Sequence, residues 1–146
     1  MATKTKDQTM PAYEAQRLFF EIGMEARRRI GTALSELGLT FPLAHALRLL
    51  DPDRPLPMGE LAEGLFCDAS NVTGIADRLE ARGLLVRRAG EGDRRVKMLA
   101  LTPAGAKLRR RALDLMTGPP AAIAALPEAD QRTLRDILRR AVELQS

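Results

Sequence analysis

The spacing of apolar residues predicts a chain built mostly from helices. After Pro11, apolar or small residues recur at every third or fourth position as far as Leu37, and Gly38 follows. This pattern predicts a long amphipathic helix over residues 11–38. A second helix is expected after Thr40, a residue type that caps helix N-termini, and it ends before the turn-rich segment 51–57.

Two shorter helices follow with a brief break between them. The segment 58–65 predicts the first helix. Asp68 is placed to cap the second helix, which runs to Arg82 and is stopped by Gly83. Two helices joined by such a tight turn are typical of a helix-turn-helix.

The apolar period then changes from helical to strand-like. Residues 84–88 and 96–101 are expected to form strands, and the segment 89–93 between them has two glycines and an aspartate that suit a hairpin tip. The sequence therefore predicts a small β-hairpin after the two short helices.

Two further helices are expected after the hairpin. Thr102 and Pro103 supply an N-cap and a proline in the first turn of a helix that runs through Met116. A last amphipathic helix follows Pro127. The order of elements predicts a mainly α fold with a small β-hairpin.

The composition fits one globular domain. The chain has 146 residues, of which 45% are hydrophobic and 29% are charged, as in packed proteins. The longest stretch without a charge, 115–127, contains three prolines and is shorter than the roughly 20 apolar residues that span a bilayer. The start of the chain lacks the apolar run of a secretory signal, and a single cysteine forms no internal disulfide. We expect a cytoplasmic protein with no membrane partner, with a disordered tail over 1–10 and a single domain over 11–146.

Positive charge is concentrated in one part of the chain. Eleven Lys and Arg residues and three Asp and Glu residues lie between Arg78 and Arg111, so this segment has a charge of +8 within a chain of net charge +4. Such a concentration is typical of a nucleic-acid-binding surface. Taken alone, the charge count would fit a solvated basic surface equally well.

The unit from residue 57 to residue 101 carries the residue types that a DNA-reading helix needs. In a helix-turn-helix the second helix enters the major groove and presents the residues near its N-terminus to base edges. Small polar side chains lie in the first turns of this helix, and an apolar face lies opposite them. Other short amphipathic helices also show this alternation, and the adjacent hairpin favours DNA binding. The candidate DNA-binding residues of the helix are Asp68, Ser70, Asn71, Thr73, Gly74 and Arg78.

The hairpin tip adds a second candidate contact with DNA. Arg94 and Arg95 lie in the loop, and arginine suits the narrow, negative minor groove of A-T tracts. Lys97 at the start of the second strand is a further candidate. Asp93 can orient one arginine through a charge-assisted hydrogen bond, or it can serve only to form the turn.

Four segments of the sequence carry a family resemblance. They are Leu61-Ala-Glu-Gly-Leu65, Asp68-Ala-Ser-Asn-Val-Thr-Gly-Ile-Ala-Asp-Arg-Leu-Glu-Ala-Arg-Gly-Leu84, Gly92-Asp-Arg-Arg-Val-Lys97 and Leu101-Thr-Pro-Ala-Gly105. They strongly resemble the MarR family of bacterial transcriptional regulators, over roughly residues 40–116. The resemblance implies a winged helix-turn-helix with long N- and C-terminal dimerisation helices. It also implies a homodimeric, usually repressing regulator that binds double-stranded DNA.

The resemblance assigns roles to parts of this chain. It implies a DNA-binding region over 40–101, with a recognition helix at 69–82 and a wing at 87–97, and dimerisation helices at 11–38 and 104–146. It pairs Asp93 with Arg95 in the wing. Small phenolic or other aromatic effectors reduce DNA affinity in this family, and the helices that flank the family's ligand pocket carry Phe20, Met24, Arg28, His45 and Leu49 here.

Two positions depart from the family pattern. Phe66 occupies the turn position where many members have glycine, so either the turn is wider or Phe66 adopts a left-handed conformation. Gly74 stands where many members have a longer polar or basic side chain, which puts a direct base contact at this position in doubt.

The first helix supports a dimer independently of the resemblance. Its apolar stripe continues for about seven turns, which is longer than one small winged domain can cover. A partner surface is one explanation, and packing of the first and last helices within one chain is the other.

Single residues add little evidence for other chemistry. Cys67 is expected to be a small buried hydrophobe rather than a redox sensor, and His45 is as consistent with a surface or core position as with an effector contact. No Cys/His cluster has metal-ligand spacing, and the segment 89–93 lacks the lysine and following helix of a phosphate loop. We therefore expect no enzyme, cofactor or metal.

A second alternative is a sequence-independent architectural DNA-binding protein, which would share the fold and the charge. The two classes differ in selectivity, since a regulator should prefer its operator by ~10³-fold or more, whereas an architectural protein binds all duplexes nearly equally.

Overall fold

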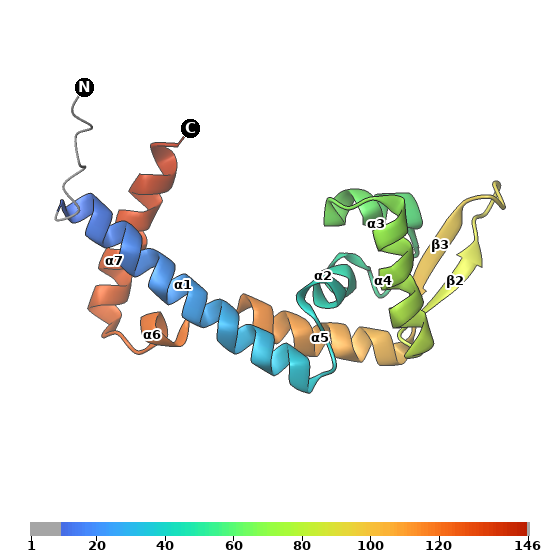
Figure 1. The fold of residues 1–146 in the computed structure, drawn as a ribbon, viewed down its shortest axis with the longest axis horizontal. Helices are drawn as coiled ribbons and strands as arrows, with labels where there is room; N and C mark the ends of the chain where they lie inside the picture. Colours follow the sequence, from blue (N-terminus) through green and yellow to red (C-terminus); the bar gives the residue numbers. More distant parts are fainter. Residues whose placement is uncertain (1–9, 146) are drawn as a thin grey trace, which may run out of the picture. The chain divides into compact units, whose positions relative to one another are not determined.

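The structure is a computed structural model that describes residues 10–145 (Figure 1). The expected disordered tail over 1–10 lies outside these residues, apart from Met10. The elements follow in the order α1 (Pro11–Glu36), α2 (Phe41–Leu49), β1 (Leu56–Pro57), α3 (Met58–Leu65), α4 (Ala69–Ala81), β2 (Leu85–Ala89), β3 (Lys97–Leu101), α5 (Pro103–Thr117), α6 (Ala121–Ala124) and α7 (Glu128–Glu143). The prediction of a mainly α fold with a winged helix-turn-helix is confirmed.

Local capping signals place several helix ends. Gly38, two residues after the last residue of α1, adopts a positive φ of 68°, as expected of a glycine that ends a helix. The Thr40 hydroxyl accepts the N–H of Leu43 at 3.5 Å and caps α2. The Thr102 hydroxyl accepts the N–H of Gly105 at 3.0 Å at the start of α5. These helix boundaries therefore follow from contacts within one turn of the chain.

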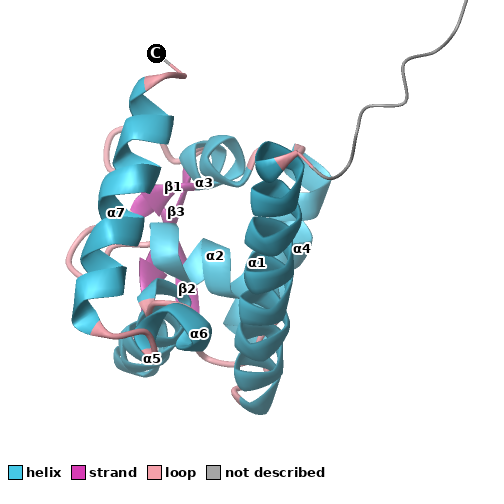
Figure 2. Ribbon diagram, turned by 90° about the vertical axis from the view of Figure 1, so that its left-hand side faces the viewer, coloured by secondary structure: helices cyan, strands magenta, loops and turns pink. Residues whose placement is uncertain are grey.

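Two short elements differ from the sequence prediction. The segment expected to be a turn-rich loop ends in β1, which pairs antiparallel with β3 through Leu56 opposite Leu99. The wing is therefore a three-stranded sheet in the order β1-β3-β2, with its strands magenta in Figure 2. Pro57 is tolerated because β1 is an edge strand, where a missing N–H costs little. The short helix α6 follows Pro120 and was not expected either.

The described chain divides into two compact units. The central unit consists of residues 30–117, and the terminal unit consists of the residues up to Arg29 together with those from Gly118 onward. The central unit contains the helix-turn-helix, the wing and α5. The expected single domain over 11–146, with 104–146 as a dimerisation segment, stays a prediction.

The central unit has one apolar core. The end of α1, the helices α2 to α5 and both hairpin strands contribute to it. Its buried residues are Leu34, Leu39, Leu43, Ala44, Ala46, Leu47, Leu50, Leu61, Val72, Ala76, Leu79, Leu84, Leu85, Leu99 and Ala112. Because α4 contributes its apolar face to this core, its opposite face is left at the surface.

The base of the wing is held close to α5. A Cβ atom at Gly105 would lie 1.9 Å from the Leu84 carbonyl oxygen, so only glycine permits this approach. The Thr102 hydroxyl also donates to the Gly83 carbonyl at 2.6 Å. These contacts fix where the hairpin leaves the core.

Candidate nucleic-acid interface

Asp68 organises the first turn of the recognition helix α4. One of its carboxylate oxygens accepts the backbone N–H of Asn71 at 2.9 Å and the hydroxyl of Ser70 at 2.8 Å. These hydrogen bonds, chiefly the one from Asn71, hold the pKa of Asp68 below its ordinary value. A negative charge here also interacts favourably with the helix dipole. Asp68 therefore shapes the base-reading end of α4, and its own contact with DNA stays a prediction.

The exposed face of α4 carries the small polar residues that the sequence singled out. Ser70, Asn71 and Thr73 are exposed. The hydroxyls of Ser70 and Thr73 donate to protein acceptors, the latter to the Ala69 carbonyl at 2.8 Å. The Asn71 side-chain amide has no hydrogen-bond partner within residues 10–145. Asparagine can pair with an adenine edge through two hydrogen bonds, so Asn71 has the side chain best suited to base readout.

Gly74 and Arg78 continue this face along α4. A Cβ atom at Gly74 would meet no heavy atom within 4 Å, so the glycine leaves open space rather than serving a close contact inside the protein. Arg78 is exposed. Ile75, on the apolar face of α4, is half-buried and packs against the core. The face can therefore approach a polyanion closely at Gly74 and meet it with a cation at Arg78.

Asp93 shapes the tip of the wing through the backbone. Its carboxylate accepts the backbone N–H of Arg95 at 2.9 Å, which is the contact of an Asx turn. In the described part of the chain no ion pair joins Asp93 to Arg94 or Arg95. The expected pairing of Asp93 with the Arg95 guanidinium is thus not seen here, and an orienting role on DNA stays a prediction.

Arg87 joins the wing to the recognition helix. Its guanidinium contacts the Asp77 carboxylate at 2.5 Å and also pairs with Glu80. The hydrogen bond that Arg87 donates to the Asp77 carboxylate is the main reason that the pKa of Arg87 is raised. Sequence reasoning missed this bridge. The sequence shows that Asp77 and Glu80 are three residues apart on one helix. Only the folded chain brings both carboxylates to Arg87 on β2.

Arg82 ties the end of α4 to the end of α1. Its guanidinium donates to the Gly38 carbonyl at 2.6 Å and to the Leu37 carbonyl at 3.0 Å. A cation at these carbonyls is favoured by the helix dipole. In the sequence Arg82 is only one of the residues of the basic segment. In the structure its hydrogen bonds hold the end of α4 against the end of α1.

The remaining basic side chains of α4 and the wing are at the surface. With Arg82 and Arg87 engaged in contacts inside the protein, the exposed basic residues of these elements are Arg78, Arg88, Arg94, Arg95 and Lys97. Figure 1 shows the β2–β3 hairpin beside α4, with its tip extending free of the other elements of the central unit. The basic residues therefore lie on the two elements that were expected to contact DNA.

The residues expected at an effector pocket fall into both units. Phe20 and Met24 are exposed on α1, and Arg28 contacts Glu25 at 2.8 Å, all in the terminal unit. His45 and Leu49 are half-buried on α2 in the central unit. The structure does not place the two groups relative to each other, so their shared pocket stays a prediction.

His45 is involved in a local contact of its own. Its Nε2 atom accepts a hydrogen bond from the Arg48 guanidinium at 2.6 Å. Burial and, to a lesser extent, the neighbouring charge of Arg48 lower the pKa of His45. The imidazole is therefore neutral near pH 7.

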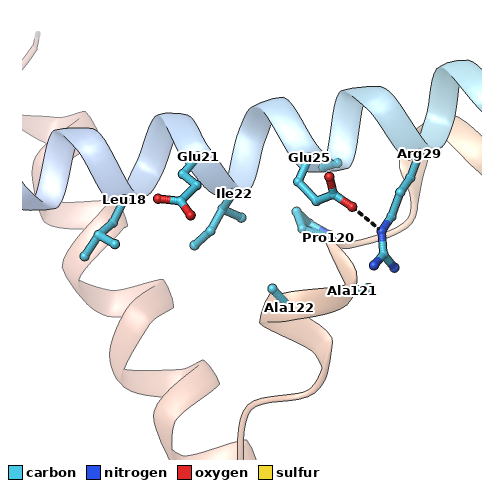
Figure 3. Close-up of a pocket in the computed structure, with 9 residues that line it drawn as sticks. Leu18, Glu21, Ile22, Glu25, Arg29, Pro120, Ala121 and Ala122 are labelled. Atoms are coloured by element: carbon cyan, nitrogen blue, oxygen red, sulfur yellow. Dashed lines mark hydrogen bonds and ion pairs between the residues drawn. The ribbon is translucent and has the colours of Figure 1, made fainter.

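The terminal unit contains a hollow between α1 and α6 (Figure 3). Its volume is about 260 Å³. An ion pair at its rim joins Glu25 to Arg29 at 2.7 Å, and hydrogen bonds from Arg28 and Arg29 lower the pKa of Glu25 to about 2. The hollow is lined by Leu18, Glu21, Ile22, Glu25, Ala26, Arg29, Pro120, Ala121 and Ala122. It thus lies beside a different set of α1 residues from those expected at the effector pocket.

Three further features of residues 10–145 concern metal ligation, membrane crossing and the single cysteine. Within them, no group of three or more His, Cys, Asp or Glu side chains is placed to hold a metal ion. None of the described helices combines the length and apolar character needed to cross a membrane. Cys67 is a free, half-buried thiol packed against the core.

Known proteins are similar to this chain in sequence and in fold. The model of the MarR family matches residues 39–97. The organic hydroperoxide resistance transcriptional regulator of Bacillus subtilis is 31% identical over 98 residues, which is 67% of each chain. The HTH-type transcriptional repressor Rv2887 of Mycobacterium tuberculosis is 29% identical over 124 residues, 84% of this chain and 89% of that protein.

A solved structure extends the likeness to the fold. MepR, a transcription regulator of the Staphylococcus aureus multidrug efflux pump MepA, is 20% identical and superposes with a TM-score of 0.80. The superposition covers 90% of this chain and 98% of MepR. With the family match and the Bacillus relative, this likeness extends from sequence to fold: the chain belongs to the MarR family of transcriptional regulators.

Proposed function

We propose that the protein is a homodimeric regulator that binds a specific DNA operator, with α4 in the major groove and the β2–β3 wing in the minor groove. The observation that carries the proposal is the exposed first turn of α4, where the Asn71 amide is unpaired among the described residues. Exposed Arg94 and Arg95 on the wing support it. The bridge from Arg87 to α4 supports a shared orientation of the two DNA-contacting elements.

Exposed apolar side chains in the terminal unit support a dimer. On α1, Phe19 is 64% exposed and Met24 is 66% exposed. On α7 no described residue is buried, and Val142 is 62% exposed. Apolar surface of this kind marks protein interfaces. A two-fold dimer would place two α4 helices about 34 Å apart, one turn of B-DNA, and would read a pseudo-palindrome.

The proposal includes a more specific element: the protein represses transcription, and a small phenolic or other aromatic effector relieves the repression. Phe20 and Met24 offer apolar contacts to such a ring, and Arg28 is a cation nearby on the same helix. Titration of the operator complex with a set of small phenolic acids tests this part. We expect one of these acids to release the protein from DNA. We expect the same acid to release the Met24→Ala variant less effectively. If no phenolic acid changes operator affinity at millimolar concentration, this part fails.

DNA selection tests the main proposal. Fragments bound from a random duplex library should yield a pseudo-palindrome that binds ~10³-fold or more tightly than random DNA. Asn71→Ala and Thr73→Ala should lose this preference while keeping weak general binding. Thr133→Ala is a matched control, because the hydroxyl of Thr133 also donates to the carbonyl four residues earlier on an exposed helix. Equal binding of all duplexes by the unmodified protein would favour an architectural protein instead.

Sedimentation tests the dimer. Val142→Glu places a charge on the exposed apolar face of α7 and should shift the protein toward monomer, whereas Thr133→Glu on the same helix should not. A stable monomer of the unmodified chain at micromolar concentration, with full affinity for a single half-site, would overturn the dimer.

A further inference from the structure

The turn between α3 and α4 holds an aromatic residue in an unfavourable backbone conformation. Phe66 follows α3 with φ 51° and ψ 40°, in the left-handed region. The other described residues of positive φ are Gly38, Gly83 and Gly92. A side chain in this region crowds the following carbonyl, which glycine avoids. Phe66 in this conformation therefore lowers the stability of the fold relative to glycine at the same position.

Packing within the protein does not explain the aromatic ring. Phe66 is 94% exposed, whereas its neighbours Leu65 and Cys67 are half-buried against the core. The turn is closed by backbone hydrogen bonds, from Phe66 N–H to the Glu63 carbonyl at 3.1 Å and from Cys67 N–H to the Ala62 carbonyl at 3.2 Å. Any residue except proline can make these bonds. The ring therefore adds nothing visible to the folding of the turn.

Phe66 lies next to the N-terminal end of α4, the end that is proposed to read DNA. Phe66 is two residues before Asp68, the N-cap of α4, so their Cα atoms are within about 7 Å of each other. No basic residue lies within three positions of Phe66 in the sequence. A contact made by this turn with DNA is therefore apolar rather than ionic. The apolar group that the major groove offers is the 5-methyl group of thymine.

We propose that Phe66 determines specificity by packing its ring against the methyl group of a thymine at the edge of each half-site. This inference rests on the proposed function, because it requires α4 to enter the major groove. The unfavourable backbone conformation is then retained for DNA recognition, as strained residues are at other functional sites.

Replacement of thymine by uracil in the selected operator tests the proposal, because it removes only the methyl group. Each thymine is replaced in turn, and the affinity of the unmodified protein is expected to fall about threefold to tenfold at one position per half-site. Phe66→Gly should lose at least about fivefold on the thymine operator and should bind the thymine and uracil versions of that position equally. Phe66→Leu should keep part of the preference.

A second variant and a stability measurement separate recognition from folding. Asparagine tolerates the left-handed region, so Phe66→Asn removes the ring by an independent route and should match Phe66→Gly on DNA. Neither variant should have a lower melting temperature than Phe66→Leu, since the ring is exposed. A loss of affinity that is equal on thymine and uracil operators, or no loss at all, would overturn the role of Phe66.

The proposed function and the role of Phe66 would be contradicted by different results. If the unmodified protein shows no operator preference, the proposed function itself is wrong, and this is known before any variant is made. If it selects an operator but no thymine-to-uracil change weakens binding, only the role of Phe66 is wrong.

Discussion

Asp93 can act on the wing through its shape or through its charge, and two substitutions separate these roles. Asp93→Asn keeps an oxygen that can accept the Arg95 N–H and removes the negative charge, whereas Asp93→Ala removes both. If the Asx turn is what matters, Asp93→Asn should bind the operator at least as tightly as the unmodified protein, and Asp93→Ala more weakly than Asp93→Asn. Equal weakening in both variants would instead indicate that the carboxylate charge orients an arginine. Operator affinities at one salt concentration decide between them.

The capping role of Asp68 predicts a pH-dependent stability. Because its pKa is lowered in the folded protein from the ordinary 3.8, its ionised form stabilises the fold above that pH, and this contribution is lost as the pH falls through the lowered value. Asp68→Ala should therefore melt below the unmodified protein at pH 7, with a difference that shrinks on acidification toward pH 2. Asp68→Asn should retain much of the cap at both pH values. Thermal melts across this range check the prediction, and a difference that is independent of pH would contradict it.

Two glycines in helices predict opposite effects of the same substitution. Gly74 in α4 has open space where a Cβ would lie, so Gly74→Ala should stabilise the free protein by about 0.5–1 kcal/mol through helix propensity. A Cβ atom at Gly105 in α5 would lie 1.9 Å from the Leu84 carbonyl oxygen, so Gly105→Ala should destabilise the protein by about 1–3 kcal/mol through overpacking. Denaturant unfolding measures both. Similar effects of the two substitutions would mean that this difference in space has no energetic consequence.

Positive charge is concentrated in residues 78–111, which contain the end of α4, the wing and the first part of α5, and this predicts the salt dependence of DNA binding. Replacing Arg94 and Arg95 by alanine removes four charges from a dimer. If all four neutralise phosphates, the slope of log affinity against log salt should flatten by up to about 3.6. Arg139→Ala with Arg140→Ala is a matched control, because it removes the same charge from adjacent exposed residues of α7. An unchanged slope in the wing variant, or an equal change in the control, would exclude the wing from the interface.

Local signals in the sequence were enough to predict most elements and which face of α4 is exposed. The ends marked by Gly38, Thr40, Asp68 and Thr102 agree with the structure. They depend on contacts within a few residues, so a single segment contains all the information that determines them. The exposed face of α4 was predictable for the same reason, since helical periodicity places its polar residues opposite its apolar ones.

Contacts between distant segments needed the folded chain. The pairing of Leu56 with Leu99, the bridge from Arg87 to α4 and the hydrogen bonds of Arg82 to the end of α1 join residues that no local pattern connects. The sequence also left two possibilities for the turn at Phe66, a wider turn or a left-handed residue, and the structure shows the left-handed one. The outcome depends on how α3 and α4 pack against the shared core. Packing of that kind is a property of the assembled fold rather than of any one segment.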